Sequence, residues 1–173
     1  MSDAAADARD ALALAVERLT TAHARTEALA ELQTPRRIGP FRRAPRFVPV
    51  AEVWRLGVLL LSAGSTGDHR LFATGAVTRA GDPRHPNFTS ASGEERREVR
   101  EAARRAGFAA GETVNYGAIG LPLDDTLGTI GPLVLRDDGL FVRWNRLSPD
   151  SLAPFDGYLR ERVELLADPP AGA

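Results

Sequence analysis

The chain has 173 residues, of which 43% are hydrophobic and 26% charged, with a formal net charge of −1, and these proportions exclude wholesale disorder and a fibrous architecture. It contains no cysteine, which excludes disulfides, thiolate metal sites and cysteine nucleophiles. All 22 basic residues are arginine, and the absence of lysine excludes P-loops, Schiff-base chemistry and serine–lysine hydrolases.

Residues 1–33 are predicted to form a helical arm. They lack glycine and proline, and apolar or small residues recur at helical spacing from Ala8 to Leu29. This apolar face is thin, so the helix is expected to pack on the rest of the chain or to self-associate as a coiled coil. Asp3, Asp7 and Asp10 stand where a secretory signal would carry positive charge. We therefore expect a cytoplasmic protein.

Residues 34–50 are predicted to form an extended linker rich in proline and arginine. Pro35, Pro40 and Pro45 recur every five residues and prevent a helix. The segment contains no acid and five arginines, namely Arg36, Arg37, Arg42, Arg43 and Arg46.

Residues 51–173 are predicted to form the core domain, with strands before and after a helix. Residues 53–62 resemble a buried strand, and residues 70–80 its antiparallel partner. A capping box opens a helix over residues 92–106, and residues 112–118 are a probable strand. Residues 132–135 and 140–145 flank a turn and predict a second hairpin, followed by a helix from Pro154.

This order predicts an α+β fold. Its mostly antiparallel sheet of about five strands would carry two packed helices, preceded by the long N-terminal helix. A parallel doubly wound sheet would need a crossover helix after nearly every strand. No apolar run approaches membrane-spanning length, so no membrane contact is expected.

Weak candidates for catalysis are His85, which lies among hydroxyl side chains, and Asp124. A base must reach its nucleophile, and closeness in a loop sequence does not establish that geometry. The serines near His85 can equally organise the start of the following helix. The three histidines show no helical pair spacing, so no metal and no cofactor are predicted.

Polar side chains on a half-buried strand suggest a ligand site. Asn115 and Tyr116 need hydrogen-bond partners there, which a small polar ligand or the chain itself can supply. Trp144, at the end of the second hairpin, allows the same two interpretations.

The five arginines of residues 34–50 are the predicted partner-binding residues. They can pair with phosphates, with an acidic protein, or with acids of the same chain or of a second copy. The slightly acidic whole chain and the lack of a nucleic-acid-binding motif argue against nucleic acid. We therefore expect a homo-oligomer or an acidic protein partner.

Several pieces of the chain, among them VWRLGVLLL (53–61), LFATGAVTRA (71–80) and GETVNYG (111–117), resemble a group of short actinobacterial proteins of unestablished function. Some members carry the label glutaminase, so the resemblance implies an amide hydrolase. Serine-type glutaminases use a Ser-x-x-Lys pair and amidotransferase-type ones a cysteine, and this chain offers neither.

Two functional hypotheses follow. In the first, the protein is a non-catalytic binding or assembly module that uses the N-terminal helix and the arginine-rich segment. In the second, it is a small amide hydrolase with His85 or Asp124 as the base, and with Asn115 and Tyr116 positioning the substrate. The first needs no unseen arrangement of catalytic groups.

Overall fold

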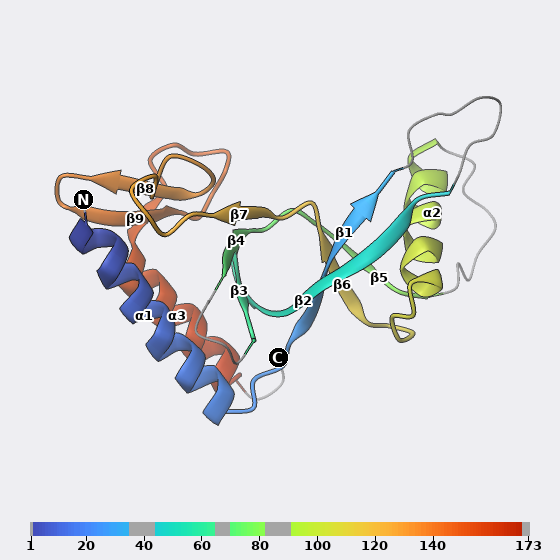
Figure 1. Cartoon of the computed structure of the whole chain (residues 1–173), viewed down its shortest axis with the longest axis horizontal. Helices are drawn as coiled ribbons and strands as arrows, with labels where there is room; N and C mark the ends of the chain where they lie inside the picture. Colours follow the sequence, from blue (N-terminus) through green and yellow to red (C-terminus); the bar gives the residue numbers. More distant parts are fainter. Residues whose placement is uncertain (1, 35–43, 65–69, 82–90, 171–173) are drawn as a thin grey trace. The chain divides into compact units, whose positions relative to one another are not determined.

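The computed structural model describes residues 2–34, 44–64, 70–81 and 91–170. These residues form three helices and ten strands (Figure 1). In chain order they are α1 (Ser2–Thr21), β1 (Glu27–Gln33), β2 (Arg46–Leu56), β3 (Leu59–Ser62), β4 (Leu71–Ala73), β5 (Ala76–Arg79), α2 (Ala91–Arg105), β6 (Thr113–Tyr116), β7 (Ile119–Leu121), β8 (Leu133–Arg136), β9 (Gly139–Arg143), β10 (Leu152–Pro154) and α3 (Phe155–Ala167).

The α+β class and the N-terminal helix are confirmed, whereas the predicted mostly antiparallel sheet of about five strands differs from the structure, in which the main sheet is larger and mixed. A seven-stranded mixed sheet has the order β5-β6-β1-β2-β3-β4-β7, and a second sheet has the order β10-β9-β8. The sheet is mixed because β1 pairs in parallel with β6, with Ala28 beside Val114 and Leu29 beside Asn115. The pairs β5–β6, β2–β3, β3–β4 and β4–β7 are antiparallel.

The N-terminal helix is shorter than predicted. It ends at Thr21, and His23 follows in the left-handed conformation with a φ of 52°. The amides of Ala22, His23 and Ala24 donate to carbonyls of the last turn, those of Arg18, Thr20 and Leu19 respectively, which closes the helix. Glu27–Gln33 then forms β1 although its residues are good helix formers. The hydrogen bonds of β1 with β6 on one side and β2 on the other outweigh the helix propensity of its residues.

The first hairpin also differs from its prediction. Residues 53–62, expected as one strand, turn back at Gly57, which has a φ of 65°. Leu56 thereby pairs with Leu59, and Val53 with Ser62. A hydrophobic run without proline conceals such a turn, since only the glycine permits it.

Several elements agree with their predictions. The capped helix is α2, the second hairpin is β8–β9, and Pro154 precedes α3. The helix α2 begins at Ala91, one residue before the predicted start. In the other two cases local chemistry decides the structure: a two-residue turn before Gly139, and a proline whose φ suits a helix start.

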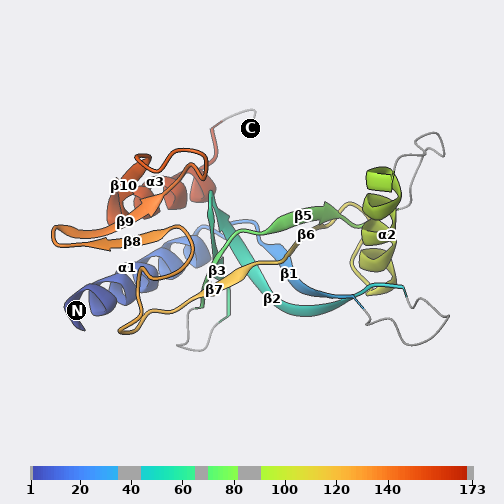
Figure 2. The same ribbon diagram turned by 90° about the horizontal axis from the view of Figure 1, so that it is seen from above.

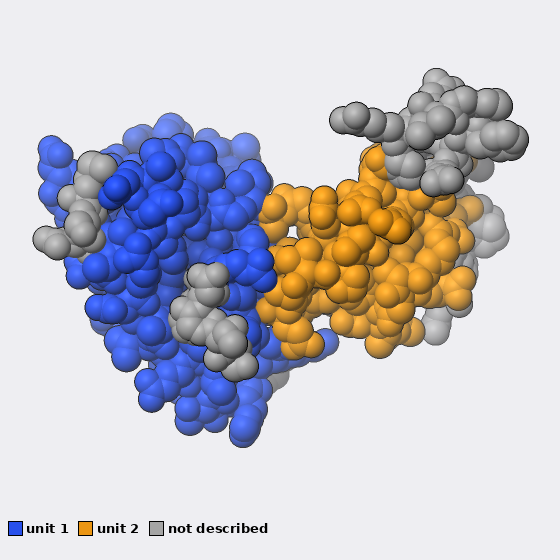
Figure 3. Space-filling model, viewed as in Figure 1, with its two compact units in different colours: residues 1–26, 53–74, 119–173 blue, residues 27–52, 75–118 orange. Residues whose placement is uncertain are grey.

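The chain divides into two compact units (Figure 3). Unit 1 comprises residues 1–26, 53–74 and 119–173, and unit 2 comprises residues 27–52 and 75–118. The segment expected as a helical arm therefore contributes α1 to unit 1 and β1 to unit 2. Residues 46–50, expected in the linker, are the first residues of β2.

In unit 1, α1 is part of the hydrophobic core. It runs beside α3 in both ribbon views (Figures 1 and 2). Its buried residues recur at spacings of three and four, and most are alanine, which lets the helix approach closely. They are Ala5, Ala8, Leu12, Ala15 and Leu19. The docking interpretation of this helix is confirmed, because its apolar face packs against its own chain.

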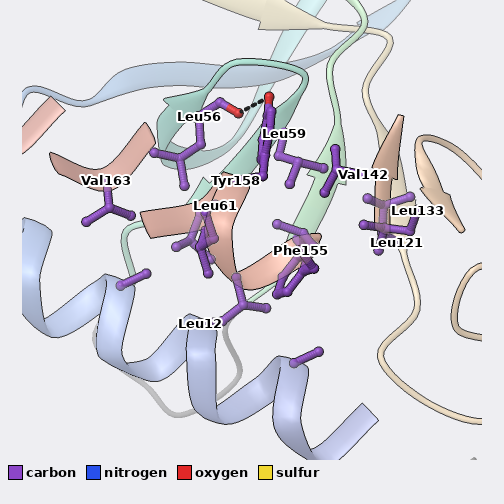
Figure 4. Close-up of a cluster of buried hydrophobic side chains, with 14 of the residues drawn as sticks. Leu12, Leu56, Leu59, Leu61, Leu121, Leu133, Val142, Phe155, Tyr158 and Val163 are labelled. Carbon is purple, nitrogen blue, oxygen red and sulfur yellow. Dashed lines mark hydrogen bonds between the residues drawn. The ribbon is translucent and has the colours of Figure 1, made fainter. Parts of the chain in front are cut away.

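Figure 4 shows the centre of this core, where α3 meets the β2–β3 hairpin. Phe155, Tyr158 and Val163 of α3 are buried among leucines of β2, β3 and α1. The Tyr158 hydroxyl accepts a hydrogen bond from the Val58 amide at 2.9 Å and donates one to the Leu56 carbonyl at 3.1 Å. These bonds fix the hairpin turn against the helix.

In unit 2, α2 packs on strands β5, β6, β1 and the start of β2. Val99, Ala102 and Ala103 of the helix are buried with strand residues such as Val114 and Phe47. The Phe47 ring meets Phe108 and Tyr116 edge to face, with centroids 6.4 and 5.4 Å away. This cluster holds the beginning of β2, where the arginine-rich segment ends.

Candidate functional site

The arginine-rich segment connects two neighbouring strands of unit 2. It leaves β1 after Gln33 and enters β2 at Arg46, and β1 and β2 are adjacent in the sheet. The exposed Arg46 side chain donates from Nε to Gln33 Oε1 at 2.9 Å, which joins the two ends. At the same end, Arg105 of α2 donates to the Pro45 carbonyl at 3.2 Å. Arg36, Arg37, Arg42 and Arg43 lie outside the described residues.

The two units carry opposite net charges in their sequences. Unit 2 contains 12 arginines and 9 acidic residues, which gives +3. Unit 1 contains 10 arginines and 14 acidic residues, which gives −4. The chain's net charge of −1 therefore conceals a basic unit, and a third of all arginines in that unit are Arg36, Arg37, Arg42 and Arg43.

Asn115 and Tyr116 belong to unit 2 but point to different surroundings. Asn115 is fully buried, and its Nδ2 donates to Glu27 Oε2 at 2.8 Å and to the Ala28 carbonyl at 3.1 Å. Tyr116 packs on Phe47 instead. Successive side chains of a strand face opposite sides of its sheet, so the two residues do not line one pocket. The amide of Asn115 instead fastens β6 to β1.

Trp144 belongs to unit 1 and begins a loop that closes on itself. Its amide donates to the Ser151 carbonyl at 3.1 Å, and Ser151 Oγ accepts from the Asn145 amide at 3.1 Å. Trp144 is half exposed, and Leu147 at the loop tip is 94% exposed. The sequence offered no signal for Leu147, because exposure of a single leucine leaves no periodic pattern.

Asp124 also belongs to unit 1, where it organises a turn. Its Oδ1 accepts from the Thr126 amide at 2.8 Å and from Thr126 Oγ1 at 2.7 Å. These bonds, the hydroxyl first, hold the pKa of the Asp124 carboxyl below its ordinary value. A carboxylate with a lowered pKa is a poorer general base near neutral pH. The other candidate, His85, lies outside the described residues.

The lowered pKa predicts a pH-dependent role for Asp124 in stability. The folded state binds its proton less readily than the unfolded state, so its stabilising contribution is present above the unfolded pKa and lost as the pH falls through the folded pKa. Asp124→Ala is therefore expected to lower the urea midpoint near neutral pH, and the difference from wild type should vanish in strong acid. Asp125→Ala serves as the matched control, and an equal, pH-independent loss in both variants would contradict the prediction.

The described part of the chain contains neither a candidate metal site nor a candidate membrane-spanning helix. No three histidine, aspartate or glutamate side chains gather there in a way that could hold a metal ion. None of the helices α1, α2 and α3 is both long and apolar enough to cross a membrane.

The comparisons with known proteins found no match: no family model, no curated protein and no solved structure resembles the chain significantly.

Proposed function

We propose that the protein is a non-catalytic binding module, in which unit 2 binds an acidic protein partner through the arginine-rich segment. The observation that carries the proposal is the anchoring of this segment. Its two ends meet at neighbouring strands, where Arg46 bonds to Gln33 and Arg105 to the Pro45 carbonyl. The two ends of the segment, Thr34 and Pro45, thus lie beside folded strands of unit 2.

The chemistry of arginine suits this task. A guanidinium group offers donors in a planar fork that matches a carboxylate, and it keeps its charge at every physiological pH. An acidic partner would therefore meet several guanidinium groups that are close together in the sequence.

The other candidate partners and activities lack a supporting observation. The chain carries no nucleic-acid-binding motif and has a net charge of −1, so a nucleic acid has less support than an acidic protein. For the amide hydrolase, Asp124 binds Thr126 and Asn115 binds Glu27, so both side chains already have structural roles. The hydrolase remains a hypothesis that ammonia release from glutamine would test.

The proposal predicts that arginines of the segment contribute more to binding than arginines elsewhere. Arg42→Gln/Arg43→Gln is expected to weaken binding of a poly-glutamate peptide roughly two- to thirtyfold, because each of two solvent-exposed ion pairs contributes about 0.2–1 kcal/mol. Added salt should weaken wild-type binding further. Fluorescence anisotropy of a labelled peptide measures both effects.

The matched control is Arg136→Gln/Arg160→Gln, which removes the same charge from exposed positions of unit 1. Equal losses in the two double variants would show that only net charge matters and would refute the assigned site. Tighter binding of duplex DNA than of poly-glutamate would favour a nucleic-acid partner instead.

A further inference from the structure

The outward face of α1 combines acidic residues with an exposed leucine. Asp7, Asp10, Leu14 and Glu17 recur at spacings of three and four, which places them along one side of the helix. That side lies opposite Leu12 and Leu19, which are fully buried. All four side chains are exposed, and Leu14 is 68% exposed although it is a large apolar residue.

The two arginines of α1 do not neutralise this face, because both bind other parts of unit 1. Arg9 donates to the Leu123 carbonyl. Arg18 makes a bidentate salt bridge with Glu164 of α3. The distances are 3.0 Å from Nε to Oε1 and 2.8 Å from Nη2 to Oε2. The outward face of α1 therefore presents acids around one apolar side chain.

We propose that this face binds the arginine-rich segment of a second copy of the chain. The inference rests on the proposed function and names the acidic partner as α1 of another molecule. The segment matches the face in chemistry, because its sequence between Pro35 and Arg43 places Ile38 and Phe41 between two pairs of arginines. Guanidinium groups would meet the carboxylates, while an apolar side chain would cover Leu14.

The dimensions of the two partners agree. Asp7 and Glu17 are separated by about 15 Å along the helix axis, from the rise of about 1.5 Å per residue. The chain between Arg37 and Arg42 can reach roughly 17 Å when extended, at up to about 3.4 Å per residue. One segment can therefore place an arginine near each end of the acidic face with its apolar residues between them.

The two surfaces belong to different units of the chain. The ends of the segment are held in unit 2, by Arg46 and Arg105, whereas α1 is held in the core of unit 1. Each copy carries both surfaces, so two copies can exchange segments in two equivalent contacts. Two simultaneous contacts strengthen each other, since the second forms within an existing complex.

A charge exchange tests the proposal. Variant A carries Asp10→Arg and Glu17→Arg, and variant B carries glutamate in place of Arg36, Arg37, Arg42 and Arg43, so that the segment becomes negative. We expect sedimentation velocity at low salt to give wild-type protein a mass above 18.6 kDa that rises with concentration. Each variant alone should sediment as a monomer, since its helix face and its segment then have the same sign. An equimolar mixture of A and B should recover association, because both contacts regain opposite charges.

The control variant Asp125→Arg/Asp156→Arg changes the net charge as variant A does, at exposed positions outside α1, and it should associate like wild type. Wild-type protein that stays at 18.6 kDa at every concentration would overturn the inference, and so would a mixture that remains monomeric. Monomeric protein that still binds poly-glutamate through Arg42 and Arg43 would leave the proposed function standing. Wild-type protein that neither self-associates nor binds poly-glutamate would refute the pairing of copies and the proposed function alike.

Discussion

Replacing Leu12 by alanine is expected to lower the free energy of unfolding by about 2–5 kcal/mol, whereas Leu14→Ala should change it by less than about 0.5 kcal/mol. Leu12 is fully buried in the core of unit 1, and its truncation leaves a cavity among α3 and the β2–β3 hairpin. Leu14 stands two residues later on the same helix and is 68% exposed. Urea unfolding followed by circular dichroism measures both changes.

The pair of variants separates two roles of α1. If the helix were a loosely attached arm, both substitutions would have small effects on the stability of the remaining chain. A large loss for Leu12 alone would show that α1 is an integral layer of unit 1. Any change in self-association caused by Leu14→Ala can then be attributed to the outward face of α1, because the substitution does not disturb the fold.

Replacing Gly57 by alanine is expected to cost about 3 kcal/mol, from left-handed strain and from displaced hydrogen bonds. Gly57 has a φ of 65°, and an alanine Cβ there would lie 2.2 Å from the Tyr158 hydroxyl. That hydroxyl bonds the Val58 amide and the Leu56 carbonyl, so moving it breaks the contact between turn and helix. Thermal or urea unfolding measures the loss.

Gly157→Ala is the matched control. This glycine lies within α3, next to Tyr158, and no atom outside its immediate surroundings lies within 4 Å of an added Cβ. Alanine should therefore stabilise the helix by about 0.5–1 kcal/mol. In a Tyr158→Phe background, Gly57→Ala should cost less than in wild type, because the clashing oxygen is gone. If Gly57→Ala lowers the free energy of unfolding equally in wild type and in Tyr158→Phe, the loss comes from backbone strain at residue 57 and not from the contact with the Tyr158 oxygen.

Local chemistry in the sequence predicted the elements that depend on few residues. Ser92 and Glu95 marked the start of α2, and Pro154 marked the start of α3. The turn before Gly139 marked the β8–β9 hairpin. Each of these signals acts over three or four residues, so it does not depend on what packs against the element.

The candidate site was predictable in composition but not in geometry. The concentration of arginine in residues 34–50 is visible in the sequence, and so are the polar residues Asn115 and Asp124. Their partners are not, because Glu27 lies 88 positions from Asn115 and Arg105 lies 60 from Pro45. Hydrogen bonds between such distant residues exist only once the strands have found their neighbours.

The sequence by itself determined the absence of thiols and primary amines, the α+β class and the position of the arginines, since these depend on composition and short-range pattern. Only the tertiary structure decided that Glu27–Gln33 is a strand between β6 and β2 rather than the end of a helix. It also decided which face of α1 is buried and which is left to solvent. The physical reason is that strand pairing and core packing are long-range interactions, and they outweigh helix propensities worth only tenths of a kcal/mol per residue.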